Sequence, residues 1–229
     1  MKVLCCDTSN RTCCAGIFED GRELSYEISL EKKTHSETFM PLMMRVFREC
    51  GLNPADMDVL AVTTGPGSFT GIRIGLSSVK GMALATGLNV IPVSSLKALA
   101  LSAENVVADP SDTIIVPCFD ARNDRVFASA IDDATGNYLI EDNAYFNEDF
   151  VGLLKKIPDA SDKQIIVVGD GAETVRRALF FSHRVEYAPG AVILPKGIMS
   201  ASEGITPVNG AAVKASYCAV SRAERYSNT

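Results

Sequence analysis

Two aspartates and two glycine-containing turns are the residues of this chain whose types and positions could do chemistry. Each aspartate ends an apolar run, and a glycine turn follows a later apolar run in the same half of the chain. A carboxylate can hold a magnesium ion, and backbone N–H groups between a glycine turn and a helix can bind a phosphate. The pattern predicts a nucleotide or anion site, working or vestigial, that comprises Asp7, Thr8, Gly65, Gly67, Ser68, Asp120 and Gly169.

The same residues also have a structural interpretation. The segment Gly65-Pro66-Gly67 makes a turn, and Ser68 can cap the helix that follows. Its glycine spacing fits neither the dinucleotide fingerprint nor a P-loop, so turn formation is the favoured interpretation there. Asp7 and Asp120 could each hold a metal-bound phosphate or cap a turn between strands, and the sequence leaves both open.

Residues for nucleophilic or metal catalysis are poorly represented. The chain has two histidines, and a metal pair starting at His35 would need a second histidine where Phe39 stands. Seven cysteines include no C-x-x-C pair, and neighbouring cysteines on a strand point to opposite faces. We therefore expect no catalytic residue, no metal site and no disulfide framework.

Composition limits the partners that the chain can bind by itself. Its 229 residues carry a net charge of -6 with a pI of about 5.0. Proteins that bind nucleic acid directly usually carry a basic patch and a positive charge. Because this chain is acidic, we expect it to contact nucleic acid only through a partner. The chain shows neither a signal peptide nor an apolar run long enough to span a bilayer, which predicts a cytoplasmic protein.

The elements that must position these residues begin with two hairpins in series and continue with alternating helices and strands. The patterns predict strands over Lys2–Asp7, Thr12–Phe18, Leu24–Leu30, Val59–Thr63 and Asn89–Val93, and helices over Ser36–Cys50, Thr70–Thr86 and Ser94–Glu104.

A fainter copy of this order follows a joint at 109–112. Strands are predicted over Thr113–Phe119, Arg125–Ile131, Tyr138–Glu141, Gln164–Val168 and Val185–Tyr187, and helices over Asn147–Lys156, Ala172–Phe181 and Gly190–Ser202, the last interrupted by Pro195.

A β-β-β-α-β-α-β-α order that occurs twice indicates an α/β protein with a duplicated actin-like ATPase fold, of the ASKHA and ribonuclease H-like type. We predict a first domain over 1–108 and a degenerate second domain over 109–229. The tail after Ile205 is poorly patterned, and its last residues, 221–229, are expected to be mobile.

The two long helices of the first half are apolar over too wide an arc to be covered by one sheet. Either they cover each other within the chain, or they present a shared face to a partner, and both can hold. The candidate interface residues are Phe39, Met40, Met43, Met44, Phe47, Ile72, Gly75, Leu76, Val79 and Met82.

Several strings together resemble one family. They are DTS, THSE, VTTGPGSFTGIRIGLSSVKGMA, IPVSSLKAL, DAR and GDGA. The chain resembles the TsaB (YeaZ) family of bacterial proteins of tRNA threonylcarbamoyladenosine biosynthesis, glycoprotease-like paralogues of TsaD. The resemblance is densest over residues 1–100.

The resemblance implies a non-catalytic scaffold that binds the transferase TsaD through the two long helices. It also implies a homodimer when the chain is alone, a TsaE-like ATPase in the complex, and tRNA bound only through the complex. ATP, ADP and metal are expected on the partners, because the TsaD metal pair His-x-x-x-His is here His35 and Phe39. The alternative is an active nucleotide-dependent enzyme that uses the cleft between the domains.

Overall fold

A computed structural model describes residues 1–30, 34–103, 109–176 and 184–218. The chain divides into two compact units. Unit 1 comprises Met1–Ser102 and Val192–Ala215, and unit 2 comprises Ala103–Ala191 and Ser216–Thr229. Among the described residues, no helix has both the length and the apolar character needed to cross a membrane.

Unit 1 is built on a six-stranded sheet with the strand order β11-β5-β4-β1-β2-β3. The three central strands β5, β4 and β1 run parallel, whereas β2, β3 and β11 pair antiparallel. Every residue of β4 is buried, as expected for a strand covered on both faces. The strands are β1 (Lys2–Asp7), β2 (Cys13–Glu19), β3 (Arg22–Ser29), β4 (Val59–Gly65), β5 (Asn89–Ser94) and β11 (Val208–Asn209).

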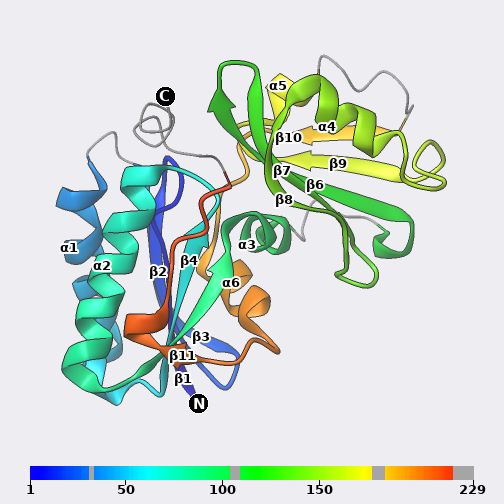
Figure 1. The fold of residues 1–229 in the computed structure, drawn as a ribbon. Helices are drawn as coiled ribbons and strands as arrows, with labels where there is room; N and C mark the ends of the chain where they lie inside the picture. Colours follow the sequence, from blue (N-terminus) through cyan, green and yellow to red (C-terminus); the bar gives the residue numbers. More distant parts are fainter. Residues whose placement is uncertain (31–33, 104–108, 177–183, 219–229) are drawn as a thin grey trace. The chain divides into compact units, whose positions relative to one another are not determined.

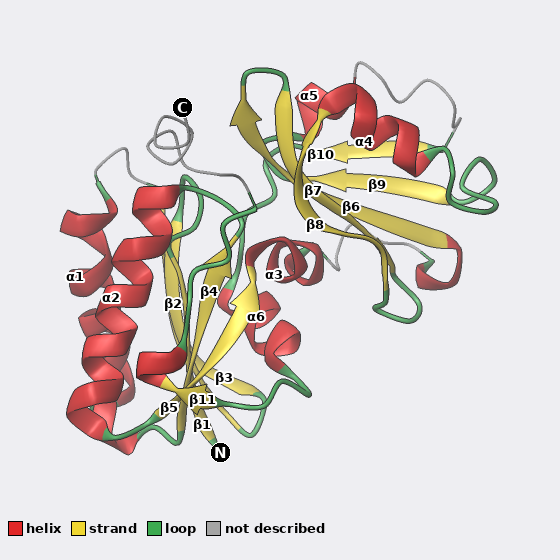
Figure 2. Ribbon diagram, viewed as in Figure 1, coloured by secondary structure: helices red, strands yellow, loops and turns green. Residues whose placement is uncertain are grey.

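Two helices cover each face of this sheet (Figure 1, Figure 2). The long helices α1 (His35–Cys50) and α2 (Phe69–Thr86) lie on one face, and α3 (Ser95–Ser102) and α6 (Pro195–Ser202) lie on the other. Successive residues of β2 face opposite sides of the sheet: Ala15 packs in the core under α1 and α2, whereas Gly16 faces Pro195 of α6. The unit therefore has three layers.

The ends of the long helices follow capping rules. Thr34 caps α1, and its backbone N–H donates to the Glu37 carboxylate at 3.3 Å, so the helix begins at His35, one residue before the predicted start at Ser36. The predicted cap at Ser68 is confirmed, because its Oγ accepts from the Gly71 N–H at 3.2 Å.

Unit 2 repeats the plan of unit 1. Its sheet has the order β10-β9-β6-β7-β8, which matches β5-β4-β1-β2-β3 strand for strand, with the same parallel and antiparallel pairings. The predicted duplicated actin-like fold is confirmed. The elements are β6 (Thr113–Arg122), β7 (Arg125–Asp132), β8 (Tyr138–Phe146), α4 (Asn147–Leu154), β9 (Gln164–Val168), α5 (Ala172–Arg176) and β10 (Val185–Ala188).

The prediction of one continuous second domain from residue 109 to 229 is wrong for residues 192–215. Helix α6 packs against α3 and the sheet of unit 1, and the Leu194 N–H donates to the Ser102 Oγ at 2.9 Å. Pro195 is the first residue of α6, where its missing N–H leaves no helical bond unmade, so it does not interrupt a helix from Gly190. The chain thus returns to unit 1 after completing unit 2.

Part of the tail is also ordered. Strand β11 extends the sheet of unit 1, and Val213 is buried in its core. The predicted mobile segment 221–229 lies outside the described residues, as do the ends of two predicted helices, at Glu104 and Phe181.

Candidate functional site

Asp7 is fully buried at the carboxyl end of β1. Its Oδ1 accepts from the Ser9 N–H at 3.0 Å, the Ser9 hydroxyl at 2.6 Å and the Thr63 hydroxyl at 2.5 Å. Its Oδ2 is buried and has no hydrogen-bond partner within the described part of the chain. Burial raises the pKa of the Asp7 carboxyl, and the bonds from Ser9 and Thr63 offset part of that rise. In this arrangement the carboxylate organises its own turn and cannot reach a ligand.

Thr8 connects the same turn to helix α2. Its hydroxyl donates to the Gly71 carbonyl at 2.7 Å and accepts from the Gly75 N–H at 3.0 Å. A Cβ at Gly75 would collide with this hydroxyl, and a Cβ at Gly71 would collide with the Thr8 carbonyl. The small residues on this face of α2 are therefore explained by close contact with the chain's own turn over residues 7–9, the Asp7–Ser9 turn.

The glycine loop before α2 is occupied in the same way. The Ser68 N–H, which could have bound an anion, donates to the Ser9 carbonyl at 2.7 Å. Gly67 also lies against that carbonyl, and Gly65 ends β4 beside Ser94. The five site residues predicted in the first half lie in one region, but their polar groups are bonded to neighbouring residues of the chain, such as Ser9 and Gly71, rather than forming a cradle for phosphate.

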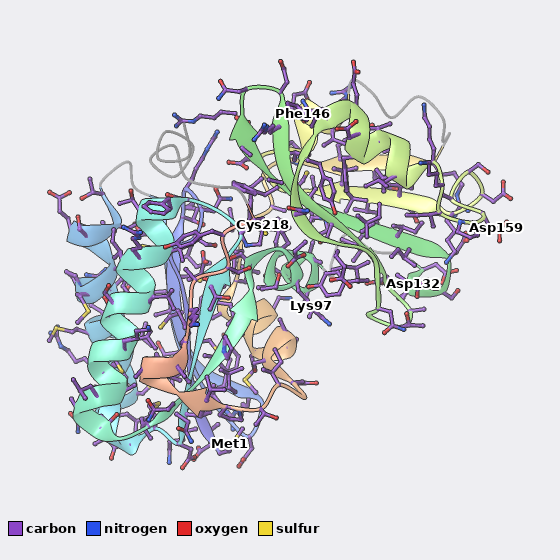
Figure 3. All side chains as sticks on the ribbon, viewed as in Figure 1. Met1, Lys97, Asp132, Phe146, Asp159 and Cys218 are labelled. Carbon is purple, nitrogen blue, oxygen red and sulfur yellow. The ribbon has the colours of Figure 1, made fainter. Side chains whose placement is uncertain are left out.

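Unit 2 holds the other two predicted residues. The Asp120 N–H donates to Asp170 Oδ1 at 3.0 Å, and Asp120 Oδ1 accepts from the Arg122 N–H at 2.8 Å. The Gly169 N–H donates to the Ala188 carbonyl at 3.1 Å. Asp120 is exposed and lines a hollow that also includes Phe146. Phe146 lies at the end of β8, where α4 begins (Figure 3). These contacts stabilise the turns after β6 and β9.

The nucleophile and metal candidates are engaged or buried. The His35 Nε2–H donates to the Asn10 carbonyl at 2.5 Å, and Phe39, one turn further on, is buried in the core. Burial raises the pKa of the Cys5 and Cys14 thiols well above their ordinary value, which keeps them protonated and unreactive. Over the described ranges, no three His, Cys, Asp or Glu side chains are grouped to hold a metal ion.

Most of the predicted interface residues are unavailable to a partner. Met82 is partly buried against the core of unit 1, and only Met40 and Met44 are exposed. Burial leaves only Met40, Met44 and, in part, Met82 of the predicted interface accessible, because the others pack in the core between α1, α2 and the sheet of unit 1 or against the Asp7–Ser9 turn. The residues buried in this way are Phe39, Met43, Phe47, Ile72, Gly75, Leu76 and Val79.

An apolar surface nevertheless remains on the outer side of both helices. Met40 and Met44 on α1 are 44% and 57% exposed, and Phe69 and Leu84 on α2 are 40% and 88% exposed. The Arg73 guanidinium lies 3.8 Å from the centroid of the Phe69 ring. A groove of about 500 Å³ separates the first turns of the helices. We name as the docking surface Met40, Met44, Phe69, Arg73, Ile74, Ser77 and Leu84.

Sequence reasoning missed Phe69 and Leu84. Leu84 follows Ser77 by seven residues, which places both on one face of α2, so the spacing carried a signal for it. Phe69 directly follows the cap residue Ser68, where the apolar periodicity of the helix has not yet begun, and no comparable signal marked it.

The two units share one strand order. Each has an aspartate at its first strand and a glycine turn before its second helix. These features define a duplicated actin-like protein. A family model described as TsaD, tRNA N6-adenosine threonylcarbamoyltransferase, matches residues 29–184. The chain belongs to this family and, within it, to the TsaB/YeaZ proteins.

Individual relatives agree with this placement. The chain is 29% identical over 171 residues to the tRNA threonylcarbamoyladenosine biosynthesis protein TsaB of Bacillus subtilis, covering 74% of this chain and 71% of that one. It is 34% identical over 137 residues to TsaB of Haemophilus influenzae, covering 57% of this chain and only 54% of that one. The structure of YeaZ from Pseudomonas aeruginosa has the same fold, with a TM-score of 0.79 at 22% identity, and the match covers 94% of this chain and 99% of that one.

Proposed function

We propose that this chain is a non-catalytic subunit for the formation of N6-threonylcarbamoyladenosine in tRNA, and that it binds a TsaD-like transferase through the docking surface. The observation that carries the proposal is the exposure of Met40, Met44, Phe69 and Leu84 on two adjacent helices. Large apolar side chains gathered on one face are typical of protein–protein contacts, and methionine adapts to the shape of a partner.

The choice of a transferase as the partner is supported by its shared fold. The transferase family model matches a range of this chain that includes both α1 and α2. A transferase of that family therefore has counterparts of the two helices, and two similar helix pairs can pack about a pseudo-twofold axis. The same reasoning supports a homodimer when the transferase is absent.

We infer the rest of the assembly from the resemblance to the TsaB family. A TsaE-like ATPase would complete it, and ATP, ADP and metal would be bound by the partners. The net charge of -6 disfavours direct binding of tRNA, so we expect tRNA to be held through the complex, in the cytoplasm.

The alternative of a nucleotide-dependent enzyme has less support in unit 1, because the Thr8 hydroxyl and the Ser68 amide are engaged within the chain. ATP turnover by the isolated chain is the measurement that separates the two functions. Turnover that Asp120→Ala abolishes in a folded protein would contradict the non-catalytic role.

Mixing the purified chain with the TsaD-type transferase of the same organism, followed by size-exclusion chromatography and calorimetry, tests the docking. Met44→Glu should weaken binding by at least about thirtyfold, in the range of an interface hot spot, with an unchanged melting temperature. Leu139→Glu, which also charges an exposed apolar residue but on β8 of unit 2, should bind as the wild type does. Full binding and full tRNA modification with Met44→Glu would refute the proposed surface.

A further inference from the structure

The Thr8 hydroxyl contacts both members of one hydrogen-bonding pair of helix α2. In a regular helix the Gly75 N–H would donate to the Gly71 carbonyl four residues earlier. Here the Thr8 hydroxyl donates to the Gly71 carbonyl at 2.7 Å, and the Gly75 N–H donates to the oxygen of that hydroxyl at 3.0 Å. The hydroxyl of a side chain from the β1–β2 turn therefore bridges a carbonyl and an N–H of the backbone ladder of α2.

Insertion of a side chain between a helical carbonyl and its N–H is one of the recognised causes of a helix bend. We propose that Thr8 is a positioning residue that fixes the course of α2 at Gly71–Gly75 and so shapes the docking surface. The inference rests on the function proposed above. Thr8 is buried, so it acts on a partner only through α2.

Part of the docking surface lies on the stretch of α2 that Thr8 contacts. Phe69 is the first residue of α2 and precedes Gly71, whereas Arg73 and Ile74 lie between the two glycines. All three line the groove between α1 and α2. A change in the course of the helix here would move this wall of the groove relative to Met40 on α1, and complementarity with a partner depends on that spacing.

Threonine suits this position for a chemical reason. A hydroxyl both donates and accepts, so one oxygen satisfies the carbonyl and the N–H together. Valine has the same shape and can do neither, whereas serine keeps the hydroxyl. The pair Thr8→Val and Thr8→Ser therefore separates the hydrogen bonds from the packing of the side chain.

The test measures transferase affinity by calorimetry together with the melting temperature. Thr8→Ser should bind within about threefold of the wild type, and Thr8→Val should bind at least about tenfold more weakly while remaining folded. A folded Thr8→Val that binds as the wild type does would overturn the inference.

A double variant covers the case in which Thr8→Val does not fold. In Thr8→Ala/Gly75→Ala the new methyl group at position 75 takes the space of the lost hydroxyl, and the N–H of residue 75 can donate to the Gly71 carbonyl as in a regular helix. This variant should be folded and should still bind at least about tenfold more weakly. Wild-type binding would overturn the inference, and so would failure to fold, because Thr8 would then serve the fold and not the course of one helix.

Met44→Glu in the same assay distinguishes the two proposals. If Met44→Glu binds as the wild type does, the docking surface itself is wrong, and with it the premise of this inference. If Met44→Glu weakens binding and a folded Thr8→Val does not, the docking surface stands and the positioning role of Thr8 is wrong.

Discussion

The Thr63 hydroxyl donates to the Asp7 carboxylate at 2.5 Å, across the parallel strands β1 and β4. Both residues are buried at the carboxyl ends of their strands. The bond joins the Asp7–Ser9 turn to the strand that leads into the glycine loop, and the Ser68 N–H joins that loop back to Ser9. The place where the sequence predicts an anion site is thus an internal polar network that fastens α2 to the sheet.

Removing the Thr63 hydroxyl should destabilise the protein more than removing that of its neighbour. A hydrogen bond to a charged group contributes about 1.5–3 kcal/mol and a neutral one about 0.5–1.5 kcal/mol. Thr63→Val takes a donor from a buried carboxylate, whereas Thr64→Val removes a neutral bond to the Val93 carbonyl at 3.2 Å. Urea denaturation at neutral pH should show the larger loss for Thr63→Val, and equal losses would argue against an ionised Asp7.

The buried carboxyl of Asp7 should also leave a signature in the pH dependence of stability. Its folded-state pKa is raised, chiefly by burial, above an unfolded value of about 4. Between these two values the folded state holds more protons than the unfolded state, so the free energy of unfolding falls as pH rises. Above the folded-state pKa the loss is complete.

The measurement compares the wild type with Asp7→Asn by urea denaturation from acid to neutral pH. The free energy of unfolding of the wild type, minus that of Asp7→Asn, should fall as pH rises above about 4 and then level off. The difference cancels the other titrating groups. A difference that rises with pH would mean that the hydrogen bonds of Ser9 and Thr63 outweigh burial.

The order of helices and strands along the chain, and its duplication, could be predicted from the sequence because they depend on local signals. The buried strand β4 begins with a continuous apolar run at residues 59–62, and Ser68 and Gly87 bound α2 by local capping chemistry. The location of α6 could not be predicted in this way. The apolar pattern of Pro195–Ser202 predicts a helix, but it does not predict which of the two similar sheets that helix packs against.

The candidate site, like the fold, could be predicted only where local sequence signals determine it. The turn residues Asp7 and Ser68 were found because strand ends and helix caps have recognisable types. The face of α2 that carries small residues is covered by Thr8, which contacts Gly75 from 67 positions away in the sequence. No local sequence pattern predicts a contact of that kind. For that reason buried residues such as Leu76 could be mistaken for surface offered to a partner.

Glycines of α2 should respond in opposite ways to the same substitution. A methyl group at Gly71 would collide with the Thr8 carbonyl, which is backbone and cannot rotate away, so Gly71→Ala should destabilise by about 1–3 kcal/mol or more. Gly81 is exposed with open space around it, so Gly81→Ala should stabilise by about 0.5–1 kcal/mol through helix propensity. Urea denaturation of the two variants checks this, and a Gly71→Ala as stable as the wild type would refute the close packing.

Two leucines of α2 separate the core from the docking surface. Leu76 is 6% exposed, and a carboxylate there would be buried without a partner, so Leu76→Glu should lower the free energy of unfolding by at least about 3–5 kcal/mol. Leu84 is 88% exposed in the last turn, so Leu84→Glu should cost at most about 1 kcal/mol, from repulsion by the helix dipole.

Both leucine variants should lose transferase binding, but for different reasons that circular dichroism and binding measured together can distinguish. Leu76→Glu should lose its helical signal and cooperative melting, so its failure to bind would say nothing about the interface. Leu84→Glu should keep both and still fail to bind, because a desolvated charge opposes association at an apolar contact. A folded Leu84→Glu that binds as the wild type does would limit the interface to Met40, Met44 and the N-terminal half of α2, around the groove at Phe69.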